Sequence, residues 1–176
     1  IDLYVRWMNN LETTRTLGAL NVFPREAEER WHERATAEGE VTFTIYELTS
    51  KRPIGTTSLS NINYRNGTAL FGILIGEQDC WNRGYGTEAT RLVLDFAFHA
   101  LGLHNVELTV FATNPRGRRA YEKAGFRLVG IRREAFRVGQ RRLDVVVMDA
   151  LATDFVSPVL ERKLTAPQEP KRVSTP

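Results

Sequence analysis

A glycine-bearing turn between an apolar run and an amphipathic segment constrains the fold of this chain more than any other feature. The turn, residues 81–87 (WNRGYGT), follows the apolar residues 70–75, which predict a buried strand. A helix that begins at such a turn directs its free N–H groups and its dipole toward a ligand, and glycines let that ligand approach the backbone. We therefore expect a site for a phosphate-rich cofactor around Gly84 and Gly86.

The glycine spacing excludes two common nucleotide-binding loops. The third glycine of a Gly-X-Gly-X-X-Gly motif would fall at Ala89, and the chain has no Gly-X4-Gly-Lys-Ser/Thr sequence. Taken alone, the turn is explained equally well as an ordinary connection between a strand and a helix. Its function must therefore be argued from the rest of the chain.

Length and composition predict a single globular domain. The chain has 176 residues, of which 42% are hydrophobic and 26% charged. No apolar run reaches the roughly 18 residues that cross a membrane, and no secretion signal is visible. The single cysteine, Cys80, cannot form an internal disulfide, which fits a reducing cytoplasm. We expect a cytoplasmic protein in which Cys80 is a small buried residue rather than a nucleophile.

The charge is unevenly distributed. Residues 115–142 contain ten basic and two acidic side chains, whereas residues 25–40 contain six glutamates and three arginines. The basic half favours an anionic ligand. A phosphorylated cofactor is a narrower explanation than nucleic acid, because no helix-turn-helix, zinc-finger or aromatic strand motif is present. A solvated charged surface remains the alternative for most of these arginines, and also for the glutamates, which could attract a cationic acceptor.

Hydrophobic periodicity predicts an alternation of helices and strands. Helices are expected at residues 2–9, 24–38, 84–99 and 115–124. Strands are expected at residues 41–45, 54–62, 68–76 and 106–110, with a final hairpin of residues 126–138 and 143–151. The tail after Pro158 shows no periodicity and predicts an extended segment. This order predicts an α/β fold, with a sheet of mixed direction covered by helices.

The helix at residues 84–99 has the clearest apolar face. The residues expected to point into the core are Ala89, Leu92, Val93, Phe96, Ala97 and Ala100. Asn66 and Gly67 predict a hairpin turn, so the strands on either side of them should pair antiparallel.

Three segments together resemble the GNAT superfamily of acetyl-CoA-dependent N-acetyltransferases. Residues 82–89 (NRGYGTEA) are similar to the pyrophosphate-binding turn and helix of that family. Asn114 and residues 121–126 (YEKAGF) reproduce its seven-residue step from Asn to Tyr. Residues 133–136 (REAF) and 144–148 (DVVVM) resemble the last two strands of its RimJ/RimL-like group, the ribosomal-protein and polyamine acetyltransferases.

The resemblance covers residues 1–156 and implies one GNAT domain, with residues 157–176 as a C-terminal extension. It implies an α+β fold whose central sheet is mixed but mostly antiparallel, is flanked by helices and splays at the acetyl-CoA site. The family normally has a strand just before the first helix, whereas this sequence starts within that helix, so we expect that strand either to be missing or to be replaced by another segment. Leu70 stands where many relatives carry Glu, which weakens any assignment of a general base there.

The resemblance also implies a reaction: transfer of an acetyl group from acetyl-CoA to a primary amine, by direct attack in a ternary complex. The amine would belong to a protein N-terminus, a polyamine, or an antibiotic or metabolite. Tyr121 takes the position of the general acid. The implied cofactor-binding residues are Ile73, Leu74, Ile75, Arg83, Gly84, Tyr85, Gly86, Thr87, Asn114, Arg116, Arg118, Tyr121 and Lys123.

Other assignments stay open. Glu107 is a candidate base acting through water, with a cross-strand ion pair as its alternative; Glu47 is a second candidate. No spacing of His, Cys, Asp or Glu predicts a metal site. A non-catalytic acetyl-CoA-binding regulatory domain is the alternative function, and a nucleic-acid-binding domain is a more distant one. The sequence does not fix the oligomeric state, for which a homodimer is considered.

Overall fold

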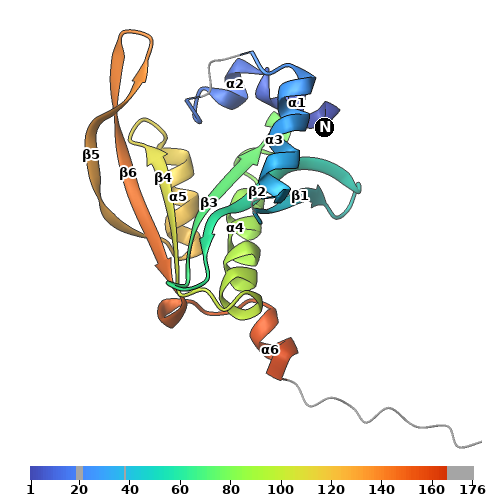
Figure 1. The fold of residues 1–176 in the computed structure, drawn as a ribbon, viewed down its shortest axis with the longest axis vertical. Helices are drawn as coiled ribbons and strands as arrows, with labels where there is room; N and C mark the ends of the chain where they lie inside the picture. Colours follow the sequence, from blue (N-terminus) through green and yellow to red (C-terminus); the bar gives the residue numbers. More distant parts are fainter. Residues whose placement is uncertain (19–21, 38, 166–176) are drawn as a thin grey trace, which may run out of the picture.

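The computed structural model describes residues 1–18, 22–37 and 39–165. Within them, six strands form one sheet in the order β1-β2-β3-β4-β6-β5 (Figure 1). Neighbouring strands are antiparallel except β3 and β4, which are parallel. This mixed, mostly antiparallel sheet confirms the predicted fold class. The strands are β1 (Val41–Glu47), β2 (Arg52–Asn63), β3 (Thr68–Ile75), β4 (Asn105–Phe111), β5 (Arg127–Val138) and β6 (Arg141–Leu151).

Helices flank the sheet. Figure 1 shows α1, α2 and α3 gathered beside the upper ends of β2 and β3, while the β5–β6 hairpin rises on the opposite side of the molecule. The helix α4 packs on β2 and β3, and α5 packs beside α4. The α-helices are α1 (Asp2–Met8), α2 (Leu11–Thr14), α3 (Arg25–Ala37), α4 (Tyr85–Asp95), α5 (Pro115–Ala124) and α6 (Leu160–Thr165).

The main core lies between α4 and one face of the sheet. Leu94 of α4 is completely buried, and so are Leu59 of β2, Val106 of β4 and Met148 of β6. Burial of apolar area of this kind is the dominant favourable term in folding. The core holds β2, β4 and β6 together beneath α4, and the sheet can open only beyond this core.

A smaller apolar cluster places α1 at the end of β3. Trp7 and Met8 of α1 pack against Leu74. A Cβ at Gly76 would lie 2.2 Å from the Trp7 ring, so only glycine at this position permits the contact. The indole N–H of Trp7 donates to Glu77 at 2.9 Å, which fixes the helix beside the glycine turn that follows β3.

The inward face of α4 differs from its prediction. Leu92 is 46% exposed and Ala100 is exposed, whereas Thr90 and Leu94 are completely buried. The buried face of α4 therefore contains Ala89 and Thr90 and, one helical turn later, Val93 and Leu94, but not Leu92. A π-helical segment, Phe96–Ala100, continues α4 and rotates the following residues, which explains why Ala100 faces outward.

Two short helices were not predicted. The four-residue α2 begins after Asn10, whose side-chain oxygen accepts a hydrogen bond from the Glu12 N–H at 3.0 Å. The expectation of an extended tail is wrong for α6, which is held by hydrogen bonds to Asp95. The rest of that tail, residues 166–176, lies outside the described residues, and the domain boundary at residue 156 stays a prediction.

Candidate active site

The cleft of this protein opens where the parallel strands part. The strands β3 and β4 pair at three positions only, and Leu70 with Glu107 is the last of them. Beyond it each strand stays paired with its outer neighbour, β2 or β6. A cleft of about 700 Å³ lies between them. The predicted splay of the sheet is therefore present.

Both halves of the molecule contribute to the lining of this cleft. The lining residues are Thr13, Thr16 and Leu17 near α2; Ile73, Leu74 and Ile75 of β3; Cys80, Trp81, Asn82, Gly84, Tyr85, Gly86 and Thr87 of the glycine turn and α4; Thr109, Val110 and Phe111 of β4; Asn114, Arg116, Gly117, Arg119, Ala120, Tyr121 and Lys123 at α5; and Arg132, Ala135, Phe136 and Val145 of the hairpin.

The glycine turn presents an uncapped helix terminus to the cleft. Gly84 adopts a left-handed conformation (φ +88°) as the N-cap of α4 and offers no side chain to the following N–H groups. The first helical hydrogen bond runs from the Glu88 N–H to the Gly84 carbonyl. The N–H groups of Tyr85, Gly86 and Thr87 precede that bond and have no acceptor in the helix. Together with the helix dipole they form an anion-binding surface.

A carboxylate at the end of β1 holds this turn in place. Glu47 accepts hydrogen bonds from the Tyr85 hydroxyl at 2.5 Å and the Ser50 hydroxyl at 2.6 Å, and it pairs with Arg83 at 3.4 Å. The Ser50 and Tyr85 hydroxyls hold the pKa of Glu47 below its usual value, against the opposing effect of burial. Glu47 is therefore a poor proton acceptor, and it acts on the turn as a positioning residue.

The helix α5 begins at the cleft with an asparagine cap. The Asn114 side-chain oxygen accepts a hydrogen bond from the Gly117 N–H at 2.9 Å, and Pro115 occupies the first helical turn. A Cβ at Gly117 would lie 2.7 Å from the Asn114 amide nitrogen. Gly117 thus gives Asn114 the room to cap the helix and still line the cleft.

Tyr121 lies on α5, one helical turn beyond Gly117. Its ring packs edge-on against Phe71, with centroids 6.3 Å apart, and against Phe126. Burial raises the pKa of Tyr121 to about 12. Within the described part of the chain its phenol group has no hydrogen-bond partner. Tyr121 is therefore a neutral phenol that lines the cleft and can donate a proton.

Cations line the same cleft from α5. Arg116, Arg119 and Lys123 recur at three- and four-residue steps and so share one face of the helix. The Arg116 guanidinium stacks over the Trp81 ring, 4.0 Å from its centroid. Burial, together with the nearby charge of Arg15, lowers the pKa of Arg116. These groups add positive charge beside the uncapped terminus of α4.

The sequence of residues 1–127 matches the model of a protein family described as the acetyltransferase (GNAT) domain. The chain belongs to the GNAT family of acetyltransferases. The matched residues include β1, β2 and β3, which form one side of the cleft, together with β4, α4 and α5.

Relatives of this GNAT chain are known by sequence and by structure. It is 38% identical over 110 residues to the probable N-acetyltransferase YjcK of Bacillus subtilis, a match that covers 61% of this chain and only 60% of that protein. It is 30% identical over 132 residues to the spermidine N(1)-acetyltransferase of Vibrio cholerae, 75% of each chain. A crystal structure of the Vibrio cholerae spermidine N-acetyltransferase with CoA and spermine superposes with a TM-score of 0.80 at 26% identity, over 88% of this chain and 92% of that one.

The structure separates the predicted site residues of this GNAT domain into two groups. Most of them line the cleft, but Arg83, Glu107 and Arg118 do not. Arg118 pairs with Glu122 at 2.9 Å along the outer face of α5, and the side chain of Arg83 turns to Glu47. Glu107 lies at the last pair of the parallel ladder, outside the described lining.

Three further expectations from the sequence concern the environment of Cys80, metal binding and membrane-spanning helices. Cys80 is 2% exposed, and burial raises the pKa of its thiol, as expected of a small buried residue. Over residues 1–18, 22–37 and 39–165, no cluster of three His, Cys, Asp or Glu side chains could hold a metal ion. In the same ranges no helix is long and apolar enough to cross a membrane.

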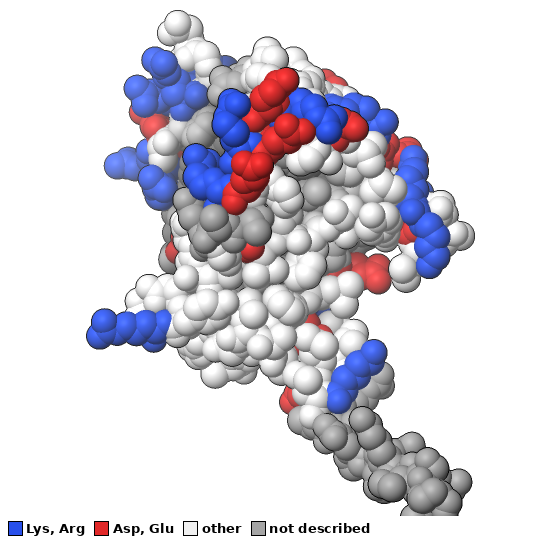
Figure 2. All heavy atoms as spheres, turned by 45° about the vertical axis from the view of Figure 1, so that its right-hand side comes forward, with Lys and Arg blue, Asp and Glu red and all other residues white. Residues whose placement is uncertain are grey.

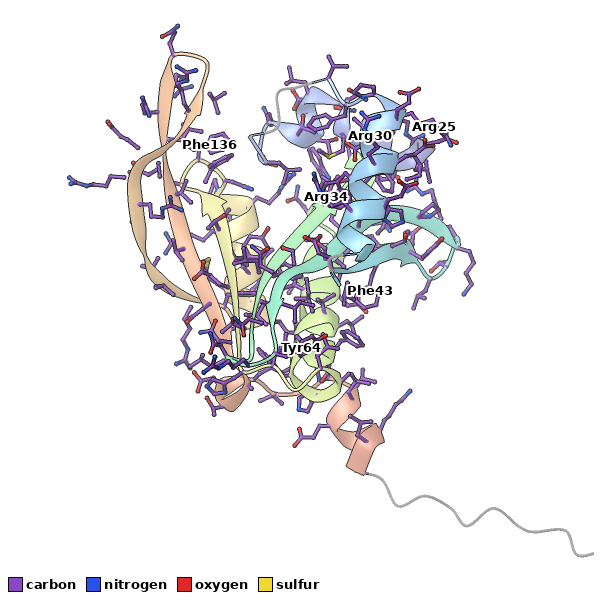
Figure 3. All side chains as sticks on the ribbon, in the orientation of Figure 1. Arg25, Arg30, Arg34, Phe43, Tyr64 and Phe136 are labelled. Atoms are coloured by element: carbon purple, nitrogen blue, oxygen red, sulfur yellow. The ribbon has the colours of Figure 1, made fainter. Side chains whose placement is uncertain are left out.

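The resemblance implied that the first two helices and the last hairpin form the acceptor side of the cleft, but sequence reasoning named none of the residues there. Thr13 and Leu17 come from the segment at α2, and Arg132 and Phe136 come from the β5–β6 hairpin. Figure 3 labels Phe136 on the hairpin, on the side facing the N-terminal helices. A Cβ at Gly18 would lie 2.5 Å from the Phe136 ring, so the segment after α2 touches the hairpin. No local periodicity connects these segments, and the only sequence signal was the long hairpin itself.

Proposed function

We propose that this protein transfers the acetyl group of acetyl-CoA to a primary amine. The observation that carries the proposal is the position of Tyr121, a neutral phenol lining the cleft where β3 and β4 part, with the uncapped N-terminus of α4 lining the same cleft. Acetyl-CoA supplies the thioester. A carbon–nitrogen bond forms as the carbon–sulfur bond breaks, the amine proton passes to water, and the departing thiolate takes the phenol proton of Tyr121, which water then restores.

The cleft residues fit the parts of coenzyme A. The N–H groups that open α4 would hold the pyrophosphate, and Arg116 or Lys123 would meet the remaining phosphate. The β3 edge beyond Leu70 has no partner strand on the β4 side, so residues 73–75 would pair with the pantetheine arm as an added strand. Asn114 would hydrogen-bond to the same arm. The side chains of Arg83 and Arg118 point away from the cleft, so Arg83 would contribute only its backbone N–H to the binding of the cofactor.

The proposed route is direct attack in a ternary complex. An acyl-enzyme would require an accessible thiolate, whereas Cys80 is buried and its pKa is raised. Positioning of the two substrates in one cleft supplies much of the rate, because it replaces a bimolecular encounter. We assign no proton transfer to Glu107, because it lies outside the described lining of the cleft.

Several finer features belong to the same proposal. Residues 133–136 and 144–148 support a place in the RimJ/RimL-like group. Spermidine and spermine are named for the Vibrio cholerae relatives, one of which is described as dodecameric. These names support a primary amine as acceptor and self-association for this chain, for which a homodimer is the smallest form. The unpaired Cys80 supports a cytoplasmic location.

Tyr121→Phe tests the proposal, with Tyr64→Phe as its matched control. Tyr64 is 65% exposed and does not line the cleft. We expect acetyl-CoA to raise the melting temperature of all three proteins, because ligand binding stabilises the native state by mass action. In a thiol-release assay over a panel of amines, Tyr121→Phe should lower kcat by about 10²-fold or more, the usual contribution of a general acid. Tyr64→Phe should keep full activity.

Two outcomes would contradict the proposal. If saturating acetyl-CoA does not shift the melting temperature, the cleft does not bind the cofactor. If acetyl-CoA binds but no amine on the panel releases thiol, the cleft serves a regulatory binding domain instead of an enzyme.

A further inference from the structure

The described residues that line the cleft carry positive charge and no negative charge. Four of the described lining residues are cationic, and none is Asp or Glu: the cations are Arg116, Arg119, Lys123 and Arg132. In the function proposed above, the phosphate groups of coenzyme A account for positive charge on α5. They do not account for Arg132, which comes from β5 on the other wall and forms no ion pair with the described residues.

The wall around Arg132 is largely apolar. Phe111 and Phe136 pack with ring centroids 4.8 Å apart, and Leu17 and Val145 line the cleft with them. Gly18 touches both rings and joins the segment after α2 to the hairpin. An acceptor that enters between α2 and the hairpin therefore meets an apolar surface with one guanidinium.

One buried hydroxyl on this wall has no partner among the described residues. Thr13 is 2% exposed and lines the cleft, and its Oγ1 is the only buried side-chain polar atom without a hydrogen bond in the described part of the chain. A buried hydroxyl of this kind costs free energy unless something satisfies it. The neighbouring Thr14 is equally buried, but its hydroxyl donates to the Asn10 carbonyl at 3.1 Å. Thr13 thus offers a hydrogen bond to a bound molecule.

The glutamates of α3 do not supply the missing negative charge. Glu29 pairs with Arg25 at 2.7 Å, and Glu28 is buried near Tyr4, where burial raises its pKa. Neither lines the cleft. Figure 2 shows the acidic side chains over the N-terminal helices as a stripe with basic side chains on both sides of it. The idea that this helix attracts a cationic acceptor is therefore not supported.

We propose that the acceptor is a primary amine with an apolar body and one anionic group, such as an amino carboxylate, rather than a polyamine. Arg132 pairs with the anion, Phe111 and Phe136 contact the body, and the Thr13 hydroxyl binds a polar group of the acceptor. A polyamine brings further ammonium groups into a cleft without carboxylates, where like charges repel one another. This inference rests on the proposed acetyl transfer and narrows its substrate class.

Three amines of equal length test the charge preference. Hexylamine, ε-aminocaproate and hexamethylenediamine each have six carbons and a primary amine at one end, and at the other end they carry a methyl, a carboxylate and an ammonium group; spermidine serves as the polyamine. We expect kcat/KM to be highest for ε-aminocaproate and lowest for the diamine and spermidine. The difference between carboxylate and diamine should be on the order of tenfold or more, and it should lie in KM.

Arg132→Glu should reverse this order, whereas Arg133→Glu is the matched control. Arg133 is the next residue of β5, is exposed, and does not line the cleft, so it changes the net charge equally. We expect Arg132→Glu to raise KM for ε-aminocaproate roughly tenfold and to lower KM for the diamine. Arg133→Glu should leave all three KM values unchanged. If both variants behave alike, a general charge effect explains the preference.

Thr13→Val and Thr14→Val separate binding from stability. Thr13→Val should raise KM for the acceptor and leave the melting temperature unchanged or higher, because the lost hydroxyl had no partner. Thr14→Val should lower the melting temperature and leave KM unchanged. Higher kcat/KM for spermidine than for ε-aminocaproate would overturn the inference while leaving acetyl transfer intact. Failure of acetyl transfer itself would appear separately, as no turnover of any amine.

Discussion

At the scale of single residues, the site depends on side chains that share one face of a helix. Asn114 and Tyr121 were predicted through their seven-residue step, and both line the cleft. Arg118 was predicted but points outward, because Glu122 lies one turn further along and pairs with it. Arg116, Arg119 and Lys123 share the inner face, but Arg118 also lies at helical spacing from Asn114 and Tyr121, so periodicity alone did not separate Arg119 from Arg118. Thr13 gave no such signal, because its role depends on a distant segment.

Gly117→Ala should destabilise the protein, although alanine normally favours a helix over glycine. The new Cβ would lie 2.7 Å from the Asn114 amide, so the asparagine must abandon its cap or shift. We expect a loss of about 1 kcal/mol in the free energy of unfolding, as for a lost N-cap, and a higher KM for acetyl-CoA. Urea unfolding and initial rates measure both. Gly130→Ala, where a Cβ meets no atom within 4 Å, is the control, and an equal loss there would refute the explanation.

At the scale of elements, the long helices and strands follow from their own periodicity, and the short ones depend on tertiary contacts. With four residues in α2 and six in α6, neither completes enough turns to show an apolar stripe. The helix α6 begins where the backbone N–H groups of Val159 and Leu160 donate to Asp95, at 3.0 and 2.8 Å. Asp95 is 1% exposed and belongs to α4, so nothing local in the tail sequence predicts this contact.

Asp95→Ala should release the segment that begins at Ser157. Burial alone would raise the pKa of Asp95, but the Ser157 hydroxyl, the two backbone N–H groups and His99 lower it. The carboxylate therefore stabilises the fold fully above about pH 4, its ordinary pKa, and the contribution is lost as the pH falls below that value. Amide hydrogen exchange, corrected for the intrinsic rate at each pH, should show lower protection of α6 in the variant at neutral pH, and in the wild type in acid.

Asp154→Ala is the control for this prediction. Asp154 pairs with Arg127 at 2.9 Å, and both side chains are exposed. Exposed pairs contribute little to stability. If Asp154→Ala accelerates exchange in α6 as much as Asp95→Ala does, the anchor does not depend on Asp95.

At the scale of the whole molecule, the fold class was predicted from the order of the helices and strands. The splay of the sheet at the cleft was implied by the resemblance to the GNAT family. The resemblance also implied which segments form the second wall of the cleft, but the residues of that wall could be predicted from neither. It requires Gly18 to meet Phe136, and the strand β5 to shift register between Arg132 and Phe136, where Glu134 adopts a left-handed conformation (φ 51°). Contacts between segments so far apart in sequence leave no periodic pattern.

The stability of the whole protein should fall in alkaline solution. Burial raises the pKa of Tyr4 and of Tyr121 to about 12, and for Tyr4 the charge of Glu28 adds to the effect. Unfolded tyrosines ionise near pH 10. The unfolded state therefore binds fewer protons than the native state above that value, and the free energy of unfolding decreases as the pH rises from about 10 toward 12. Urea titrations measure the slope, which Tyr4→Phe and Tyr121→Phe should each reduce; an unchanged slope in both would contradict the prediction.

The short parallel ladder between β3 and β4 has a mechanical consequence. It joins two half-sheets, β1-β2-β3 and β4-β6-β5, through three residue pairs at one end. Within the strand pairing of the sheet, a change in the angle between the halves disturbs only those pairs, so the ladder acts as a hinge. At the end of the cleft away from the ladder, Gly18 contacts Phe136. A bound molecule that contacts both half-sheets would fix the angle between them.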